Sequence, residues 1–159
     1  MDKLVFSGEA IAPELKEVLA AGGCISLVVT GYSMRPFLKH ERDVVYLRAW
    51  EKKDLRRGQI LLFQRTKGEF VLHRIRRVRS NGKLVMNGDG QTWCETISNE
   101  QIVAVVDAVN RKGRHLCSKS FQFRLWNWLW YPTRMIRPVL FNLGRVLLSR
   151  REKGNGSTD

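Results

Sequence analysis

Short apolar runs separated by turn-forming or charged stretches are the feature that most constrains how this chain folds. The runs are rich in Val, Ile, Leu and Phe, and their length and composition predict strands. They cover residues 24–30, 43–48, 58–64, 70–79, 84–87 and 102–109. The run at 58–64 contains four consecutive apolar residues, which favours a strand buried on both faces. The sequence therefore predicts a mainly β core.

One helix is expected before these strands. Residues 10–21 carry apolar side chains at helical spacing (Ile11, Leu15, Val18 and Leu19). Gly22-Gly23 is a natural stop for such a helix. We therefore expect an N-terminal helical segment over residues 1–23 and a β domain over residues 24–112.

The stretch Thr30–Pro36 places a serine on a constrained turn at the end of a predicted strand. Gly31 permits a sharp turn, and Pro36 fixes the direction in which the chain leaves it. A nucleophile must be held in one attack geometry, so Ser33 is a candidate. Serines are also common in ordinary turns, and the local sequence leaves both interpretations open.

The run Phe70–Arg79 contains a candidate base. Alternate residues of a strand share a face, which places His73 with Val71 and Ile75 and directs Arg74 to the opposite side. A histidine among apolar residues is often only a packed, half-buried side chain. Histidine is also the side chain best suited to accept a proton near neutral pH, so His73 is the candidate partner of a serine nucleophile.

Two carboxylates are candidates to orient that histidine. Asp89 lies in the tight turn Asn87-Gly88-Asp89-Gly90, where an aspartate commonly caps its own backbone. Alternatively its carboxylate accepts a hydrogen bond from an imidazole and stabilises the imidazolium. Glu95, six residues later, is the second candidate.

The order of these motifs resembles the S24/S26 serine peptidases, the superfamily of type I signal peptidases and SOS-repressor autoproteases. The similarity extends over about residues 25–109. The matching blocks are Gly31-x-Ser33-Met34-x-Pro36, Asp43-Val44-Val45, Gly58-x-Ile60-x-x-Phe63, His73-Arg74-Ile75 and Gly88-Asp89, followed by the apolar run Ile102–Val109.

This resemblance implies a signal-peptidase-like β core and a set of roles. Ser33 is the implied nucleophile, His73 the base and Asp89 the orienting acid, while the backbone N–H of Ser33 donates to the oxyanion. Most bacterial members have lysine where this chain has His73. Histidine at that position is typical of the archaeal and endoplasmic-reticulum branch.

The chain also departs from the family pattern. Arg42 replaces the usual glycine before Asp43, and Gln59 replaces the usual aspartate after Gly58. After Gly88-Asp89 the signal-peptidase branch has an asparagine and a second acid, a role that Glu95 could take here. The sequence before the serine carries charged residues and contains no N-terminal membrane anchor of the signal-peptidase kind.

Positive charge is concentrated toward the C-terminus. The formal net charge is +13, and from Arg111 onward there are eleven Lys and Arg residues but two acids. Aromatic residues crowd Phe121–Tyr131, and Arg134–Arg150 has apolar residues at helical spacing. Neither segment is long and apolar enough to span a bilayer. We expect a basic, aromatic tail of amphipathic helices over residues 113–151, and a disordered end over residues 152–159.

Two placements of this tail remain open. Trp, Tyr and Arg beside an apolar stripe are typical of a helix in the headgroup region of a membrane, and such a helix can instead pack on the core or on a partner. We favour an anionic membrane surface. The expected localisation is peripheral, on the cytoplasmic side, with no transmembrane helix.

The sequence thus predicts a serine endopeptidase that cleaves a leader or signal segment from a peptide or preprotein at a membrane surface. No cofactor and no metal site are expected, since the three cysteines are widely spaced. The alternative is a non-catalytic basic module that binds lipid or nucleic acid on a degenerate peptidase fold. Nucleic acid is disfavoured because the tail aromatics lie among Leu and Val rather than along a polar groove.

Overall fold

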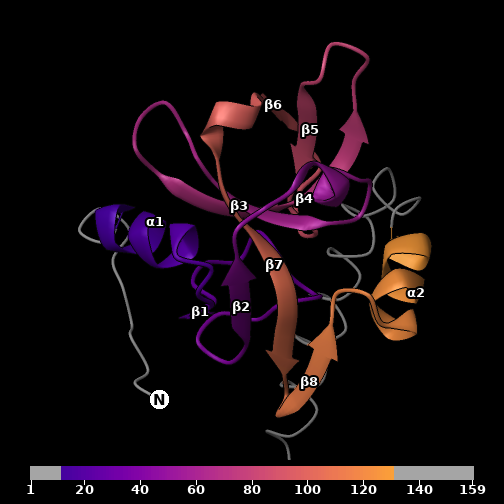
Figure 1. Ribbon diagram of the computed structural model, residues 1–159. Coiled ribbons are helices and arrows are strands. Elements are labelled where there is room, and N and C mark those ends of the chain that lie inside the picture. Colours follow the sequence, from indigo (N-terminus) through magenta and orange to yellow (C-terminus); the bar gives the residue numbers. More distant parts are fainter. Residues whose placement is uncertain (1–11, 131–159) are drawn as a thin grey trace, which may run out of the picture.

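The computed structural model describes residues 12–130, which form one antiparallel sheet with a helix near either end of this range (Figure 1). The elements in order are α1 (Ala12–Ala20), β1 (Ile25–Val28), β2 (Val44–Arg48), the 3₁₀ turn η1 (Lys52–Asp54), β3 (Ile60–Gln64), β4 (Phe70–Val78), β5 (Leu84–Asn87), β6 (Glu95–Ile97), the 3₁₀ turn η2 (Asn99–Gln101), β7 (Ile102–Arg111), β8 (Arg114–Cys117) and α2 (Phe121–Trp130). The strand order is β1-β2-β7-β3-β4-β5-β6, and β8 also pairs with β7.

The predicted mainly β architecture with an N-terminal helix is confirmed. The strands β6 and β8 were not predicted. β6 is only three residues long, and β8 (Arg-His-Leu-Cys) lacks an apolar run of its own. A two-residue turn produces β8, because Lys112 and Gly113 both have positive φ, of 53° and 77°. That combination is typical of the tight hairpin turns whose twist matches the flanking strands.

The strand β3 separates two apolar clusters. Its burial is nearly complete, as its apolar run predicts. Ile60 and Leu62 face a cluster that includes α1, β1, β2 and the first face of β7, whereas Leu61 and Phe63 face a second cluster built from β4, β5 and β6. Because successive side chains of a strand point to opposite faces, this one strand belongs to both cores.

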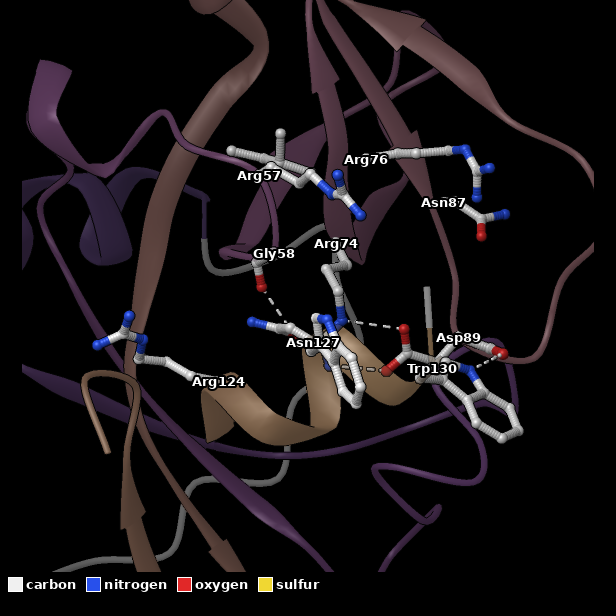
Figure 2. Close-up of a pocket in the computed structure, with 11 residues that line it drawn as sticks. Arg57, Gly58, Arg74, Arg76, Asn87, Asp89, Arg124, Asn127 and Trp130 are labelled. Atoms are coloured by element: carbon white, nitrogen blue, oxygen red, sulfur yellow. Dashed lines mark hydrogen bonds and ion pairs between the residues drawn. The ribbon is translucent and has the colours of Figure 1, made fainter. Parts of the chain in front are cut away.

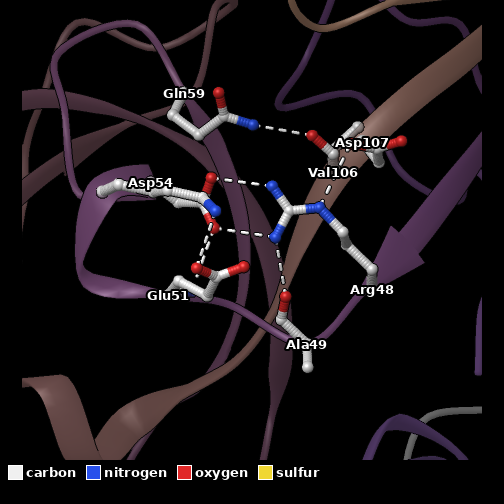
Figure 3. Close-up of polar contacts among 8 residues, drawn as sticks. Arg48, Ala49, Glu51, Asp54, Gln59, Val106 and Asp107 are labelled. Carbon is white, nitrogen blue, oxygen red and sulfur yellow. Dashed lines mark hydrogen bonds and ion pairs between the residues drawn. The ribbon is translucent and has the colours of Figure 1, made fainter. Parts of the chain in front are cut away.

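Polar side chains connect β7 to the neighbouring segments. Gln59 is 4% exposed and donates from Nε2 to the Val106 carbonyl at 2.6 Å. Nearby, the Arg48 guanidinium donates to both Asp54 carboxylate oxygens at 2.7 and 2.8 Å, and to Asp107 at 3.1 Å (Figure 3). Burial alone would raise the pKa of Asp54, but the hydrogen bonds from Arg48 and from the Glu51 backbone, with the charges of Arg48 and Lys53, together leave that pKa below its usual value. The loop that leads into β3 is thereby held against β2 and β7.

The structure does not separate residues beyond 112 from the β domain. β8 pairs with β7, and the α2 residue Phe123 is 1% exposed in the same cluster as Phe37. The two phenyl rings meet edge to face at 5.3 Å, and Trp126 lies 5.3 Å from the Phe37 ring. Strand β8 and one face of helix 121–130 therefore pack with the same core as the strands before residue 112. The expected helix over 134–150 and the disordered end over 152–159 lie outside the described residues.

Candidate active site

Ser33 lies on the turn between β1 and β2, as predicted. Gly31 has a φ of +80°, and its N–H donates to His40 Nδ1 at 3.0 Å. The residues that follow Ser33 anchor the turn, since Met34 and Phe37 are at most 2% exposed in the first cluster. Ser33 itself is half-buried. The serine is thus held by a positive-φ glycine on one side and buried side chains on the other.

The turn after β5 is packed directly against Ser33. Gly90 N–H donates to the Ser33 carbonyl at 2.7 Å. A Cβ at Gly88 would come within 2.5 Å of that carbonyl oxygen, and one at Gly90 would come within 3.0 Å of the Arg35 carbonyl. Both glycines are therefore required for this close approach, which explains why they flank Asp89.

His73 is buried in the second cluster. It is 1% exposed on β4, opposite Leu61 of β3, and it shares the face of Ile75 as the period-two pattern predicts. Its Nδ1 lies 3.0 Å from Glu95 Oε1, although the ring N–H direction is not aligned for a hydrogen bond. Its Nε2 has no hydrogen-bond partner within residues 12–130. A buried imidazole with an unused nitrogen is uncommon, because buried polar atoms are normally paired.

Glu95 is fixed by a second contact. Arg65 donates to both Glu95 oxygens, each at 2.8 Å, and also to Glu69 at 3.0 Å. Such a bidentate pair sets the plane of the carboxylate as well as its position. Arg65 therefore orients the group that faces His73.

The charges around this pair set its protonation. Burial lowers the pKa of His73, and the Arg65 charge adds to that effect while Glu95 opposes it. Burial alone would raise the pKa of Glu95, but the Arg65 hydrogen bonds and charge, with His73 nearby, bring it below its usual value. At neutral pH the imidazole is therefore neutral and the carboxylate ionised, as a base and its orienting acid require.

Asp89, the predicted orienting acid, is engaged elsewhere. It is 2% exposed, and its carboxylate accepts from Arg74 Nε at 3.0 Å and from Arg74 Nη2 at 2.7 Å (Figure 2). Its backbone carbonyl accepts from Trp130 Nε1 at 2.8 Å. His73 and Arg74 are consecutive on β4 and face opposite sides, so the carboxylate paired with Arg74 is not the one beside His73. Glu95, and not Asp89, therefore lies beside His73.

Glu95 could have been ranked first had β6 been recognised. In a strand, Glu95 shares its face with Ile97, which is buried in the same cluster as Ile75. That face is the one on which His73 lies. Arg65 was missed altogether, because no sequence pattern links it to Glu95, thirty residues away.

Ser33 and His73 are connected through the sheet rather than by a direct bond. Within residues 12–130 neither ring nitrogen of His73 has a hydrogen bond, so none joins it to Ser33 Oγ. The connection runs through β5, because Arg74 is paired with Asn87 in the ladder and the next residue, Gly88, abuts the Ser33 carbonyl. The serine turn is thus anchored one ladder position from the histidine.

Among the described residues, no group of three or more His, Cys, Asp and Glu side chains is arranged to hold a metal ion. No helix within residues 12–130 has the length and apolarity needed to cross a membrane.

Comparisons with protein-family models, with curated proteins and with solved structures found no match to this chain. Its function is therefore argued from the site itself.

Proposed function

We propose that this chain is a serine endopeptidase of the signal-peptidase type, which removes a leader or signal segment from a peptide or preprotein. One observation carries the proposal: buried His73 faces the ionised Glu95 carboxylate with one ring nitrogen, and its other ring nitrogen has no hydrogen-bond partner among residues 12–130. A histidine that only packs has no need of a carboxylate fixed by its own arginine. A general base needs both an orienting acid and an unoccupied nitrogen.

The reaction assigns one task to each group. Nε2 of His73 takes the proton from Ser33 Oγ as that oxygen attacks the scissile carbonyl carbon. The backbone N–H of Ser33 donates to the oxyanion that forms. The imidazolium then gives its proton to the leaving amine as the peptide bond breaks. Water, deprotonated by the same nitrogen, hydrolyses the acyl-enzyme and releases Ser33.

Glu95 supports the charged intermediate of this sequence. As His73 takes up a proton, its Nδ1–H and the Glu95 carboxylate attract each other more strongly, and a small rotation of either group aligns the 3.0 Å contact. Catalytic hydrogen bonds are often long in the absence of substrate and tighten when it binds. The same closing movement is required of Ser33 Oγ toward Nε2.

The proposed site of action is a membrane surface with anionic lipid. The support is the net charge of +13, together with large apolar side chains on the outer side of α2. Positive charge attracts anionic headgroups, and exposed aromatic residues enter the interface beside them.

Three variants of the full chain test the activity. Ser33→Ala and His73→Gln should each reduce cleavage of a peptide library, read by mass spectrometry, at least about a thousandfold. His115→Gln is the matched control, because His115 is exposed on β8, and it should retain full cleavage. In cells carrying Ser33→Ala, the uncleaved substrate should accumulate, so that mass spectrometry can identify it. Cleavage that survives both Ser33→Ala and His73→Gln would refute the proposal.

A second candidate is the non-catalytic basic binding module. It is favoured because no hydrogen bond joins Ser33 to His73 within the described residues, and because arginines line a pocket beside α2. If the protein is such a module, Ser33→Ala would leave its cellular function unchanged, whereas replacing the arginines of this pocket would abolish that function.

A further inference from the structure

The loop that carries Ser33 is closed at its base by backbone hydrogen bonds. Glu41 N–H donates to the Val29 carbonyl, and Val29 N–H donates to the Asp43 carbonyl, each at 2.8 Å. Asp43 is fully buried, and its carboxylate accepts from Lys39 N–H at 2.9 Å. The two ends of the loop are therefore fixed. The geometry of the site then depends on how the residues next to Ser33 are held.

The His40 side chain reaches across this loop to the residues beside the serine. Gly31 N–H donates to His40 Nδ1 at 3.0 Å, and the other ring nitrogen, Nε2, lies 3.4 Å from Glu41 Oε1. A ring nitrogen that accepts a hydrogen bond carries no proton, so the neutral imidazole holds its proton on Nε2. That proton faces the Glu41 carboxylate. The two contacts together select one tautomer of His40.

The ring of Tyr32, the residue before the serine, contacts the same histidine. The Tyr32 and His40 ring centroids are 5.2 Å apart, and the ring planes are inclined by 52°. The Arg35 guanidinium lies 4.4 Å from the Tyr32 centroid. These contacts restrict ring rotation on a turn whose tyrosine is 61% exposed. His40 is therefore restrained by a neighbouring ring as well as by polar contacts at both nitrogens.

The proposed reacting groups of Ser33 lie between two anchored points of the backbone. His40 holds the N–H of Gly31, two residues earlier, and Gly90 N–H donates to the Ser33 carbonyl at 2.7 Å. The proposed nucleophile and oxyanion donor, Oγ and N–H of Ser33, lie on the stretch between them. Gly31 has a φ of +80°, and a Cβ there would meet nothing within 4 Å. Conformation rather than crowding therefore requires this glycine, and so mobile a residue needs an external contact to fix it.

We propose that His40 is a positioning residue, which holds the Ser33 turn in its attack geometry by accepting the hydrogen bond from Gly31 N–H. The inference rests on the peptidase function proposed above and gives a second histidine a role unlike that of His73. His73 is buried and takes up a proton during the reaction, whereas His40 is half-buried and keeps its proton on Nε2. Attack and oxyanion stabilisation both depend on short distances, so a looser turn slows the chemical step more than it weakens substrate binding.

Two substitutions of His40 in the full chain separate its acceptor from its shape. Asparagine Oδ1 lies as many bonds from the backbone as histidine Nδ1, so His40→Asn keeps an acceptor, whereas His40→Leu is branched alike but has none. Both are assayed with a peptide that the parent cleaves. His40→Leu should lower kcat about tenfold or more and change KM by less than about twofold. His40→Asn should keep kcat within about threefold of the parent. Melting temperatures should differ little, because Gly31 is exposed and water can replace the lost acceptor.

His115→Leu is the matched control. The His115 ring lies 5.4 Å from the Tyr46 ring with the planes inclined by 52°, nearly the geometry of His40 on Tyr32. His115 belongs to β8, outside the loop that carries Ser33. The control should leave kcat and KM unchanged. A loss that His40→Leu shows and His115→Leu does not therefore comes from the serine turn, and not from removing an imidazole that packs on a tyrosine.

Nuclear magnetic resonance reads the same contact without any catalytic assay. Two-bond ¹H–¹⁵N spectra of the full chain at about pH 8 distinguish the protonated ring nitrogen from the bare one. The expected tautomer of His40 carries its proton on Nε2. The Gly31 amide proton should exchange with solvent faster in His40→Leu than in the parent, and at nearly the parental rate in His40→Asn.

Three results would overturn the proposal. A parental kcat in His40→Leu would mean that the turn needs no help from His40. Equal losses in His40→Asn and His40→Leu would mean that the acceptor is not what matters. A proton found on Nδ1 would remove the hydrogen bond itself. If His40→Leu fails to fold, the kcat of His40→Asn and the tautomer of the parent decide. A parent that cleaves no peptide would refute the proposed function, and the tautomer and the Gly31 exchange rates would still decide whether His40 holds the turn.

Discussion

Two neighbouring residues of β4 each meet a carboxylate, and the two contacts differ in nearly every respect. Arg74 and Asp89 are joined by two aligned hydrogen bonds, and Arg74 uses further donors on Gly58 and Asn127. His73 approaches Glu95 at a comparable distance of 3.0 Å but without alignment, and its second nitrogen has no partner among the described residues. One contact is satisfied, whereas the other is incomplete.

This difference separates a structural pair from the pair to which we assign the proposed chemistry. Arg74 and Asp89 join β4, the turn after β5 and α2, so they carry stability. His73 and Glu95 leave hydrogen-bonding capacity unused in a buried place, which costs stability and is retained where chemistry needs it. The chain thus places its architecture and its proposed chemistry on opposite faces of one strand.

Replacing each of the two acids by its amide should show the largest difference between the two contacts. Glu95→Gln should reduce turnover by roughly a hundredfold or more, because the imidazolium loses its counter-charge. The melting temperature of this variant should change little, because Glu95 is partly exposed. Asp89→Asn should instead lower the unfolding free energy by about 3 kcal/mol, since it leaves a buried guanidinium without its charge partner.

Turnover and thermal unfolding must both be measured on both variants. The expected pattern is a double dissociation, in which one variant is slow but stable and the other is less stable yet active at low temperature. If Asp89→Asn loses turnover without losing stability and Glu95→Gln turns over normally, Asp89 is the orienting acid after all, as the family resemblance implies.

The two sides of α2 provide a second contrast, between packing and surface. Phe123→Ala should lower the unfolding free energy by about 3–5 kcal/mol, because it empties the contact with Phe37 in the core. Trp128→Ala removes a larger side chain but an exposed one, and should change it by no more than about 0.5 kcal/mol. Chemical denaturation followed by far-UV circular dichroism measures both. Equal small effects would mean that α2 is only an appended tail.

Much of the fold was accessible from the sequence, because hydrophobic patterning is local. The alternation around His73 predicted its face, and the apolar run at 58–64 predicted burial of β3 on both sides. The sharp turn at Gly31, which has a positive φ, was predicted correctly for the same reason. Each of these features is decided by a few adjacent residues.

What could not be predicted depends on contacts between distant residues. β8 exists only because a two-residue turn folds it back on β7, and the aromatic residues of α2 look alike in sequence whether they face Phe37 or solvent. The choice between Asp89 and Glu95 depended on which arginine forms an ion pair with each acid. Arg74 and Arg65 lie fifteen and thirty residues from their partners, and no local pattern carries that information.

The smallest expected effect, and the one that sharpens the opening comparison, is a shift in pH dependence. Because the pKa of His73 is lowered from its usual 6.5 by burial, its neutral form persists to lower pH. The rise of kcat/KM with pH should therefore be centred below 6.5. Folding stability should fall over the same window as pH decreases from 6.5 through the lowered pKa, since the unfolded chain binds the proton first.

Glu95→Gln should move the rise of kcat/KM to a still lower pH. The Glu95 charge opposes the lowering of the His73 pKa, and removing it leaves burial and Arg65 acting without that opposition. Asp89→Asn should shift the rise less, because the Asp89 charge is the smallest of the named influences on His73 and is paired with Arg74. Profiles of kcat/KM for the parent and both variants provide the measurement. A rise centred near about 9 in the parent would identify a lysine such as Lys83 as the base, and would leave His73 as a packed core residue.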